Sequence, residues 1–382
     1  MRLFEPEGVS AVTIAAIGDV GVLGTARARA AREGWDAPFA AIAPHARAAD
    51  VAFANLEFPV GERAWVRAGR ADEFFHDAEV PGALARAGFR VLSLANNHMM
   101  DCGERGLART LEACRASGLA TAGAGANLAA ARAPAVLEVR GARVVVLAYA
   151  TATRDAAGPA SPGVAPLDAA LLAEDLARWR PRADLLVVSA HWGSMYVDYP
   201  PPRVTDLARA LEAGGADLVL GHHPHVLQGA ERRGRTLVLY SLGDAVFDSR
   251  SGDFEAAVAA RSRRESGVFT VRACSGAHGL ELAPLLLDRD GIPCAPGEDA
   301  AGAQAERFAS LSAGLADAAT RFAAEGAPKL LQYELQSLGT YLRQGRWDRV
   351  AKLLGSVRPR HLPLLWQAVA RRGRGRPGPQ GR

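Results

Sequence analysis

The sequence is poor in cysteine. Its 382 residues include four, at positions 102, 114, 274 and 294, with irregular spacing and no C-x-x-C pair. Four scattered thiols are too sparse for a disulfide framework of the kind that small secreted domains use. Nearly half of the residues, 49%, are hydrophobic, so the chain can bury an ordinary globular core instead. We therefore expect free and mostly buried thiols.

Long apolar runs are missing as well. No stretch of about 18 apolar residues occurs, so no transmembrane helix is expected. Residues 1–10 contain two acidic residues and one arginine, and the start of the chain lacks the basic end, longer apolar region and small-residue cleavage site of a signal peptide. The sequence therefore predicts a cytoplasmic protein without an integral membrane segment.

A strong excess of one charge sign is also absent, because 45 basic residues face 41 acidic ones. Part of the net charge of +4 comes from residues 371–382, which are rich in Arg, Gly and Pro and which we expect to form a disordered, solvated tail. No stripe of basic and aromatic residues accompanies the motifs described below. Nucleic acid is therefore not an expected partner.

The sequence does contain an alternation of short apolar runs with Ala-, Leu- and Arg-rich segments of helical period, which is typical of a layered α/β fold. The predicted strands are 12–17, 51–54, 91–94, 143–148, 185–190, 218–220, 236–240 and 268–273. The predicted helices between them are 37–48, 81–87, 103–116, 169–180 and 203–213. From about residue 301 the pattern is wholly helical, with helices expected at 305–324, 330–343 and 347–354. We therefore divide the chain into an α/β domain over 1–295, an all-helical C-terminal extension over 300–370 and the tail over 371–382.

Five apolar runs end in side chains that can bind a metal ion. The strongest is the run 216–221, which is followed by His223 and His225, and this spacing aims two imidazoles from a strand end into one pocket. The other four runs end at Asp19, Glu57, His98 and His191. One such ending is chance, but five in order along the chain predict one site assembled at the ends of several strands.

The two carboxylates in this set have different expected roles. Asp19 leaves its strand where Gly21 and Gly24 let the backbone turn, so it is either a hard oxygen ligand or the cap of a turn or helix. Glu57 ends the next strand and could bridge two cations. By itself, neither residue distinguishes a metal site from an ordinary strand end.

Residues 93–98 place two amides and an imidazole at the end of an apolar strand. Asn97 can offer its carbonyl oxygen to a metal, while His98 can stand beside the metal as a general acid. Asp101 follows three residues later, close enough in a turn to accept a hydrogen bond from the His98 ring. The alternative interpretation is a polar loop that caps the next helix.

A histidine such as His191, taken alone at the end of a strand, is more often structural. Together with His223 and His225 it completes three imidazoles, which with two carboxylates and one amide are about the set that two close divalent cations require. These ligand types suit Mn, Fe and Zn equally. His222 precedes the pair by one residue, so we expect it to face elsewhere, either supporting a ligand or serving the structure alone.

Together these motifs resemble the CapA-type poly-γ-glutamate capsule synthesis family, which belongs to the calcineurin-like metallophosphoesterase superfamily. The resemblance covers about residues 11–250, in the family's order and spacing. The motifs that carry it are Gly18-Asp19-Val20, Asn55-Leu56-Glu57, Leu94-Ala95-Asn96-Asn97-His98 with Asp101, His191-Trp192-Gly193, Gly215-Ala216-Asp217, Gly221-His222-His223-Pro224-His225-Val226 and Tyr240-Ser241-Leu242-Gly243-Asp244.

The resemblance implies a sandwich of two mixed β-sheets flanked by helices, and it allows a dinuclear metal site at the strand ends. Its pattern makes His98 the general acid. The ligands that it implies are Asp19, Glu57, Asn97, His191, His223 and His225.

The sequence departs from the pattern at three places. Two residues after Asp19 the superfamily has a histidine, where this chain has Gly21, so one expected ligand is missing or replaced. Met195-Tyr196 stands where the family has an acidic residue and tyrosine. Asp244 replaces an asparagine, and its carboxylate is either an extra ligand or the cap of a turn.

Two functions remain open at this point. The first is a metal-dependent hydrolase that uses metal-activated water on a phosphoester or on an amide of a glutamyl polymer, with His98 protonating the leaving group. The second is a non-catalytic accessory protein of capsule or cell-envelope polymer synthesis that keeps the fold and works by binding. The partner is a small-molecule or polymer substrate in either case, and the sequence predicts no oligomeric state.

Overall fold

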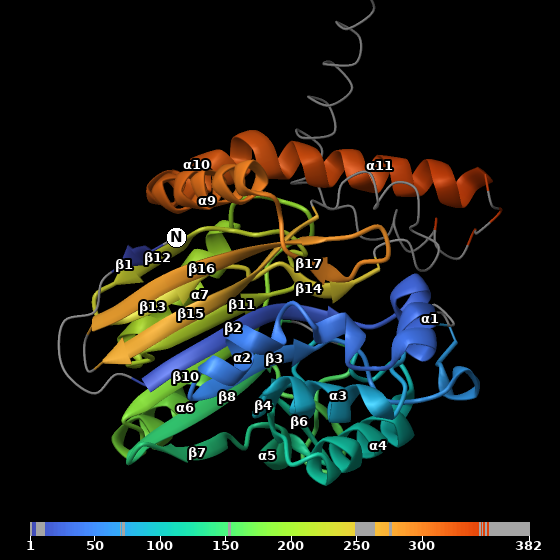
Figure 1. Cartoon of the computed structure of the whole chain (residues 1–382), viewed down its shortest axis with the longest axis horizontal. Coiled ribbons are helices and arrows are strands. Elements are labelled where there is room, and N and C mark those ends of the chain that lie inside the picture. The colour runs from blue at the N-terminus through green and yellow to red at the C-terminus, as the bar shows by residue number, and fades with distance from the viewer. Residues whose placement is uncertain are drawn as a thin grey trace, which may run out of the picture.

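The computed structural model describes residues 2–4, 12–68, 70, 73–151, 154–248, 264–274, 277–343, 345, 347 and 350. Over these residues, most strands belong to two large β-sheets that share a hydrophobic core, and helices cover the outer faces (Figure 1). Both sheets contain parallel and antiparallel pairs, so the two-sheet sandwich of mixed sheets expected from the resemblance is confirmed.

The first sheet is built around a parallel centre that is buried on both faces. Strand β3 (Val51–Leu56) is buried at every position, as expected for a parallel strand covered on both sides. Antiparallel strands extend the sheet from β2. The strand order is β1 (Arg2–Phe4), β16 (Ala277–Leu287), β15 (Glu265–Cys274), β2 (Val12–Gly21), β3, β4 (Val91–Ser93) and β5 (Ala120–Ala122), with β14 (Asp244–Phe247) on β2 and β17 (Pro293–Cys294) on β16.

The second sheet also has parallel inner strands and antiparallel edges. Its edge strand β7 (Ala135–Val139) alternates buried and exposed residues, because only one of its faces meets the core. The strand order is β12 (Ala230–Arg233), β13 (Thr236–Leu239), β11 (Leu218–His222), β10 (Leu185–His191), β8 (Ala142–Ala150) and β7. A separate two-stranded ribbon joins β6 (Ala124–Gly125) to β9 (Gly163–Val164).

Alternation along β8 shows how the layers form. Val144 and Val146 belong to the core between the two sheets, whereas Val145 and Leu147 belong to the core under helices α6 (Ala169–Trp179) and α7 (Pro202–Ala213). Successive side chains of a strand point to opposite faces, so one strand serves both layers. Burying each of these side chains contributes about 1.5–3 kcal/mol.

Helices on the other side cover the first sheet through mostly small residues. They are α1 (Gly24–Glu33), α2 (Ala43–Ala48), α3 (Glu79–Ala87) and α4 (Gly103–Ala116). The sequence did not predict α1, because its buried face consists only of Ala26 and Ala30 and gives a weak hydrophobic period. The single helix predicted over 37–48 is instead η1 (Ala37–Phe39) followed by α2, because Pro44 lacks the N–H needed inside a helix and begins a new one.

Short helical elements complete the connections. They are η2 (Arg63–Trp65), α5 (Leu128–Ala131) and η3 (Arg180–Arg182).

The described cysteines agree with the prediction of free and mostly buried thiols. Cys102 and Cys114 are free and buried, and Cys294 is free and exposed, while the side chain of Cys274 lies outside the described residues.

The C-terminal part of the described chain is helical, as predicted. Figure 1 shows it as a red layer along one side of the sandwich, beside β16 and β12. Phe308 anchors the layer, since its ring lies 5.4 Å from that of Phe269 in β15. Most of the predicted helix 347–354 and all of the tail 371–382 lie outside the described residues. The elements are α9 (Glu298–Ala313), η4 (Gly314–Asp317), α10 (Ala318–Arg321), η5 (Phe322–Gly326) and α11 (Ala327–Arg343).

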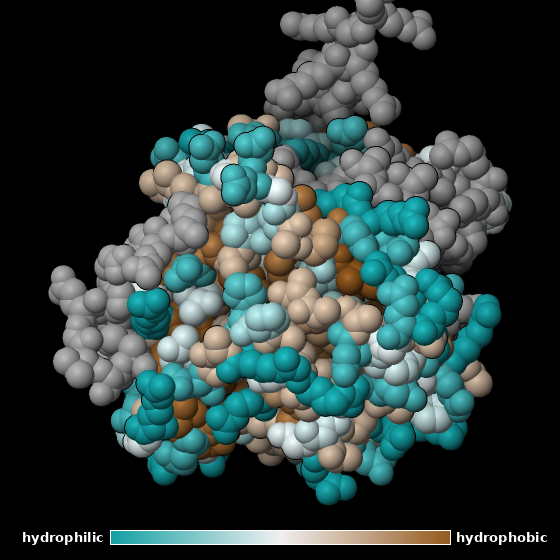
Figure 2. Space-filling view, in the orientation of Figure 1, coloured by the Kyte–Doolittle hydropathy of each residue, from teal (hydrophilic) through white to brown (hydrophobic). Residues whose placement is uncertain are grey.

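The face of the molecule seen in Figure 2 carries both hydrophilic and hydrophobic residues. Hydrophilic residues lie over α9 and along the lower border, and hydrophobic residues gather between them over the strands (Figure 2). Within the described part of the chain, no helix has both the length and the apolar character needed to cross a bilayer.

A buried histidine, His76, ties together the segments that leave β2 and β3. Its Nε2 accepts a hydrogen bond from Val22 N at 3.1 Å, and its Nδ1–H donates to Phe58 O at 3.0 Å. Burial lowers the pKa of the His76 ring to about 3. The ring is therefore neutral at pH 7, and both nitrogens hold backbone atoms that follow the two strands.

We expect the free energy of unfolding to fall as the pH falls from about 6.5 to about 3, because the unfolded chain protonates His76 in this range and the folded chain does not. This residue adds a slope of at most about 1.4 kcal/mol per pH unit. His76→Gln can make both hydrogen bonds without titrating, so urea unfolding at several pH values should show a shallower slope in the variant. His45→Gln, at a partly exposed position of α2, is the control. Equal slopes for His76→Gln and the wild type would contradict this role.

Candidate metal centre

The carboxyl ends of β2, β3, β4, β10 and β11 meet at one edge of the sandwich, and this brings the predicted ligands together. His222 and His223 at the end of β11 contact Asp19 in β2, and His191 at the end of β10 contacts Asn97 beyond β4. Two glycines make this approach possible. A Cβ at Gly18 would lie 1.8 Å from Gly243 O, and a Cβ at Gly221 would lie 2.0 Å from Tyr240 O, so only hydrogen fits.

Asp19 is fully buried and both of its oxygens are engaged. Oδ1 accepts a hydrogen bond from Asn55 Nδ2 at 2.8 Å and lies 3.1 Å from His222 Nδ1. Oδ2 accepts from His223 N at 3.1 Å and lies 3.6 Å from His225 Nδ1. Burial alone would raise the pKa of this carboxyl, but the hydrogen bond and charge of His222, with the charge of His225, hold it well below its usual range. The expectation that His222 faces elsewhere is therefore wrong, because its ring points at Asp19.

Glu57 is the second buried carboxylate. Its Oε2 accepts a hydrogen bond from Asn55 Nδ2 at 2.8 Å, so one amide bridges Glu57 and Asp19. Its Oε1 lies 3.7 Å from His191 Nε2 and has no hydrogen-bond partner among the described residues. Burial and the negative charge of Asp19 raise the pKa of Glu57 well above its usual range.

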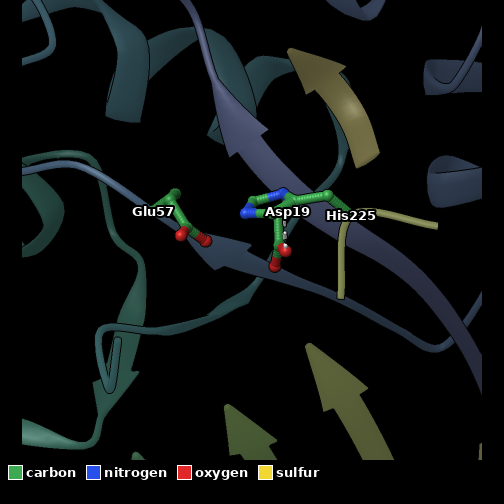
Figure 3. A group of neighbouring side chains, drawn as sticks. All are labelled: Asp19, Glu57 and His225. Atoms are coloured by element: carbon green, nitrogen blue, oxygen red, sulfur yellow. Dashed lines mark ion pairs between the residues drawn. The ribbon is translucent and has the colours of Figure 1, made fainter. Parts of the chain in front are cut away.

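Asp19, Glu57 and His225 form the tightest group of donors. One ligand atom from each lies within 4.8 Å of the other two, and all three side chains are buried. Figure 3 shows the His225 ring reaching toward the space between the two carboxylates. Two carboxylates and an imidazole suit a divalent transition metal.

A second group of donors lies beside Glu57. His191 Nε2 is 2.7 Å from Asn97 Oδ1, and the ring of His191 lies 4.8 Å from that of His223. Burial, and then the positive charge of neighbouring imidazoles, lowers the pKa of both histidine rings. Both rings are therefore neutral at pH 7, which is the form that binds metals.

Buried polar atoms without partners show that the donor set fits a cation. In the described chain, Glu57 Oε1, His191 Nδ1, His222 Nε2 and His223 Nδ1 are all buried without a hydrogen bond. Each such atom costs about 1–3 kcal/mol if nothing satisfies it. A cluster of carboxylate, amide and imidazole donors with this deficit is suited to divalent metal.

His225 is held by Asp244, the residue that replaces the family asparagine. Asp244 Oδ1 lies 2.8 Å from His225 Nδ1. Burial would lower the pKa of His225, but the charge of Asp244 and this hydrogen bond raise it to about 10. Burial raises the pKa of Asp244 to about 6 against the opposing charge of His225. The carboxylate therefore orients an imidazole, in the way that carboxylate–histidine pairs fix metal ligands.

The space around Gly21 is filled by aromatic rings. A Cβ there would lie 2.8 Å from Phe58 Cε2 and 2.9 Å from Phe247 Cδ2, so a side chain at this position requires the rings to move. Hydrophobic packing therefore occupies the place where the resemblance led us to expect a histidine.

His98 stands apart from the donors and is more accessible than they are. Its side chain is 17% exposed, whereas Asp101 is fully buried. The His98 Nδ1–H donates to Asp101 Oδ2 at 2.7 Å, and Arg70 Nε lies 2.8 Å from Asp101 Oδ1. The ring of Phe58 packs 4.7 Å away. The predicted His98–Asp101 contact is therefore present, and Arg70 joins it without any sequence signal.

The loop after β11 is held in an unusual backbone conformation. His223 has φ 94° and His225 has φ 54°, both in the left-handed region that non-glycine residues rarely adopt. Each such residue costs about 1–3 kcal/mol and persists where the surroundings enforce it. Here the strain serves to turn two imidazoles, two positions apart in one loop, toward the same cluster.

Two amides have roles that the sequence did not assign. Asn55 bridges the carboxylates, and it could have been recognised because it shares a strand face with Glu57 two residues later. Asn96 donates to Leu56 O at 2.8 Å and accepts from the backbone N–H groups of His98 and Met99. It therefore shapes the turn that presents Asn97 and His98.

Comparison with known proteins gives a clear family match. A family model described as bacterial capsule synthesis protein PGA_cap matches residues 13–249, which include every residue of this centre. The chain is 33% identical over 251 residues to the capsule biosynthesis protein CapA of Bacillus anthracis, covering 62% of this chain and 60% of that protein. It is 34% identical over 221 residues to the PGA biosynthesis protein CapA of Bacillus subtilis, covering 57% of this chain and 58% of that protein. The chain therefore spans about three fifths of the length of these curated relatives.

Among solved structures, a putative 5'-nucleotidase from Staphylococcus aureus in complex with alpha-ketoglutarate aligns with a TM-score of 0.44 and 15% sequence identity. The alignment covers 79% of this chain and 58% of that chain.

We expect Glu57→Gln to stabilise the metal-free protein and to abolish its stabilisation by metal. The variant keeps an oxygen acceptor for Asn55 but removes a buried charge beside Asp19, which raises the free energy of unfolding by roughly 1–3 kcal/mol. Because a ligand is lost, Mn²⁺ or Zn²⁺ should raise the Tm of the wild type but not that of the variant. Thermal unfolding in EDTA and in each metal measures both effects.

The matched control is Glu62→Gln, at a nearby exposed position, which should behave as the wild type. If Glu57→Gln is less stable than the wild type in EDTA and still gains stability from metal, the assignment of Glu57 is wrong.

Proposed function

The chain belongs to the bacterial capsule synthesis protein family, and on that premise we propose that it is a metal-dependent hydrolase of capsule polymer synthesis, acting on a phosphoester or on a γ-glutamyl amide. One observation carries the proposal. Buried donor atoms without hydrogen-bond partners lie in the same part of the structure as a partly exposed imidazole, His98, whose charge acts on His223 and which is held by a buried carboxylate. This combination provides for both metal binding and proton transfer.

The donors would hold one or two divalent cations. A bound cation supplies Lewis acidity and lowers the pKa of a water molecule near the substrate. Asn55 links the two carboxylates by donating to both, and Asp244 fixes the orientation of His225. The ligands would be Asp19, Glu57, Asn97, His191, His223 and His225.

His98 would act as the general acid. Because its Nδ1 is engaged with Asp101, Nε2 is the atom left to give a proton to the leaving group. Arg70 holds the other oxygen of Asp101, so the carboxylate keeps its place behind the ring. Phe58 and Phe74 pack against the ring at 4.7 and 4.9 Å and restrict its rotation.

Both proposed substrate classes need such a proton. The leaving group is an alkoxide when a phosphoester of an alcohol is cleaved, and an amine when a γ-glutamyl amide is cleaved. Either leaves poorly without protonation, so a positioned imidazole contributes about 10²–10⁴-fold to the rate.

A second candidate is a non-catalytic accessory protein of polymer synthesis. The packing of Phe58 and Phe247 against Gly21 favours it, because the donors near Asp19 lack the histidine of the superfamily pattern. In this case the centre would serve binding alone, and metal-loaded protein would turn over neither substrate class.

We expect His98→Gln to lower turnover about 10²–10⁴-fold while leaving metal content unchanged, because His98 gives a proton and binds no cation. The loss should be larger for an alkyl phosphoester or a γ-glutamyl alkylamide than for p-nitrophenyl phosphate, whose leaving group needs no proton. Steady-state rates with both kinds of substrate, together with elemental analysis, measure this difference.

His45→Gln in α2 is the control and should keep full activity and metal content. Equal losses with good and poor leaving groups would exclude His98 as the general acid. Absence of turnover of every such substrate by the metal-loaded wild type would favour the accessory protein.

A further inference from the structure

The loop over residues 193–200, here called the site loop, follows β10 directly and covers one ligand. Within it, Tyr196 stacks on the ring of His225, with ring centroids 5.9 Å apart and an interplanar angle of 30°. Tyr196 N also donates to Pro224 O at 2.8 Å, between the two histidines of the next loop. The site loop is thus in direct contact with the metal centre.

The backbone conformation of Tyr196 costs free energy. Its φ is 60°, in the left-handed region, and a tyrosine there persists only when its surroundings enforce the conformation. Besides Pro224 and His225, residues of the C-terminal helices also contact the site loop.

Tyr333 of α11 packs directly on Tyr196. The two rings meet edge to face, 6.1 Å apart at 81°, which is a favourable arrangement of aromatic rings. The Tyr333 hydroxyl donates to Tyr196 O at 3.5 Å. A residue of the C-terminal helices therefore lies one ring away from a proposed metal ligand.

The same helices hold the rest of the loop by charge. Asp198 is only 12% exposed and receives two cations from different helices. Arg307 Nη2 of α9 lies 2.8 Å from its Oδ1, and Lys329 Nζ of α11 lies 3.1 Å from its Oδ2. An ion pair in such a sheltered place keeps more strength than an exposed one.

Tyr199 completes the attachment. A Cβ at Gly314 would lie 2.5 Å from Tyr199 Oη, so the turn between α9 and α10 approaches the tyrosine as closely as a backbone can. The guanidinium of Arg321 lies over the ring of Tyr199 at 5.2 Å. Three residues of the site loop are therefore bound from α9, η4, α10 and α11.

We propose that residues 298–343 act as a clamp that holds the site loop, with Tyr333 as the positioning residue that keeps Tyr196 over His225. The inference rests on the proposed metal centre for its consequence, which is slow release of a bound cation. The family match ends at residue 249, so the clamp lies outside the matched region. The C-terminal helices would thus contribute to the metal centre, although the sequence assigned them to an extension separate from the α/β domain.

Two measurements on Tyr333→Ala test the clamp. Hydrogen–deuterium exchange of peptides that cover residues 193–200, in EDTA, reports opening of the site loop without any metal. Release of bound Zn²⁺ into excess chelator reports the covering of His225. Both rates should rise roughly two- to tenfold, which is the range expected for loss of one aromatic pair.

Matched variants separate positioning from simple loss of packing. Tyr333→Phe keeps the ring, so its rates of amide exchange and of Zn²⁺ release should be close to those of the wild type. Gln332→Ala changes the exposed neighbouring position on α11 and should leave both unchanged. If circular dichroism shows that Tyr333→Ala loses helix, Lys329→Gln, which removes one cation from Asp198, takes its place.

Unchanged exchange of the site loop in Tyr333→Ala, or equal acceleration in Tyr333→Phe, would overturn the clamp. If the wild type binds no Zn²⁺, the proposed function fails while the exchange experiment still decides whether the loop is held.

Discussion

The structure depends on the burial of two carboxylates, Asp19 and Glu57, at the place where two β-sheets meet. Burial opposes the charged form of both, and a single amide, Asn55, donates to each. Asp19 stays ionised because His222 and His225 face it, whereas Glu57 lacks comparable compensation. The histidines at the ends of β10 and β11 supply further donors, so strands of both sheets enclose one buried polar cluster in which several atoms lack hydrogen-bond partners among the described residues.

Most of the architecture and the donor set could be predicted from the sequence, because buried parallel strands are short apolar runs and their carboxyl ends share an edge. Asp19, Glu57, His191 and His225 were recognisable as polar residues ending such runs. What escaped prediction depends on contacts distant in sequence or on weak periods. His222 turns toward Asp19, and Arg70 reaches Asp101 from a segment without a regular pattern. Helix α1 was missed because alanine alone makes its buried face.

Departures from the family pattern have physical explanations in this chain. Phe58 and Phe247 occupy the space where a side chain at Gly21 would begin, and Asp244 uses its carboxylate to orient His225. The first change fills the space beside Asp19 with aromatic rings, and the second holds the ring of His225 and raises its pKa. Tyr196 then covers His225 from the site loop, with Tyr333 behind it. Helix α11, which lies beyond the family match, and Asp244 therefore both influence the position of the His225 ring.

The central claim is that the buried donors bind a divalent cation, and elemental analysis of the protein purified without added metal tests it most directly. We predict about one to two equivalents of a transition metal per chain, removable by chelation and restored by Mn²⁺ or Zn²⁺. Protein that is free of metal on purification, and that also binds neither ion when they are added, would contradict the account.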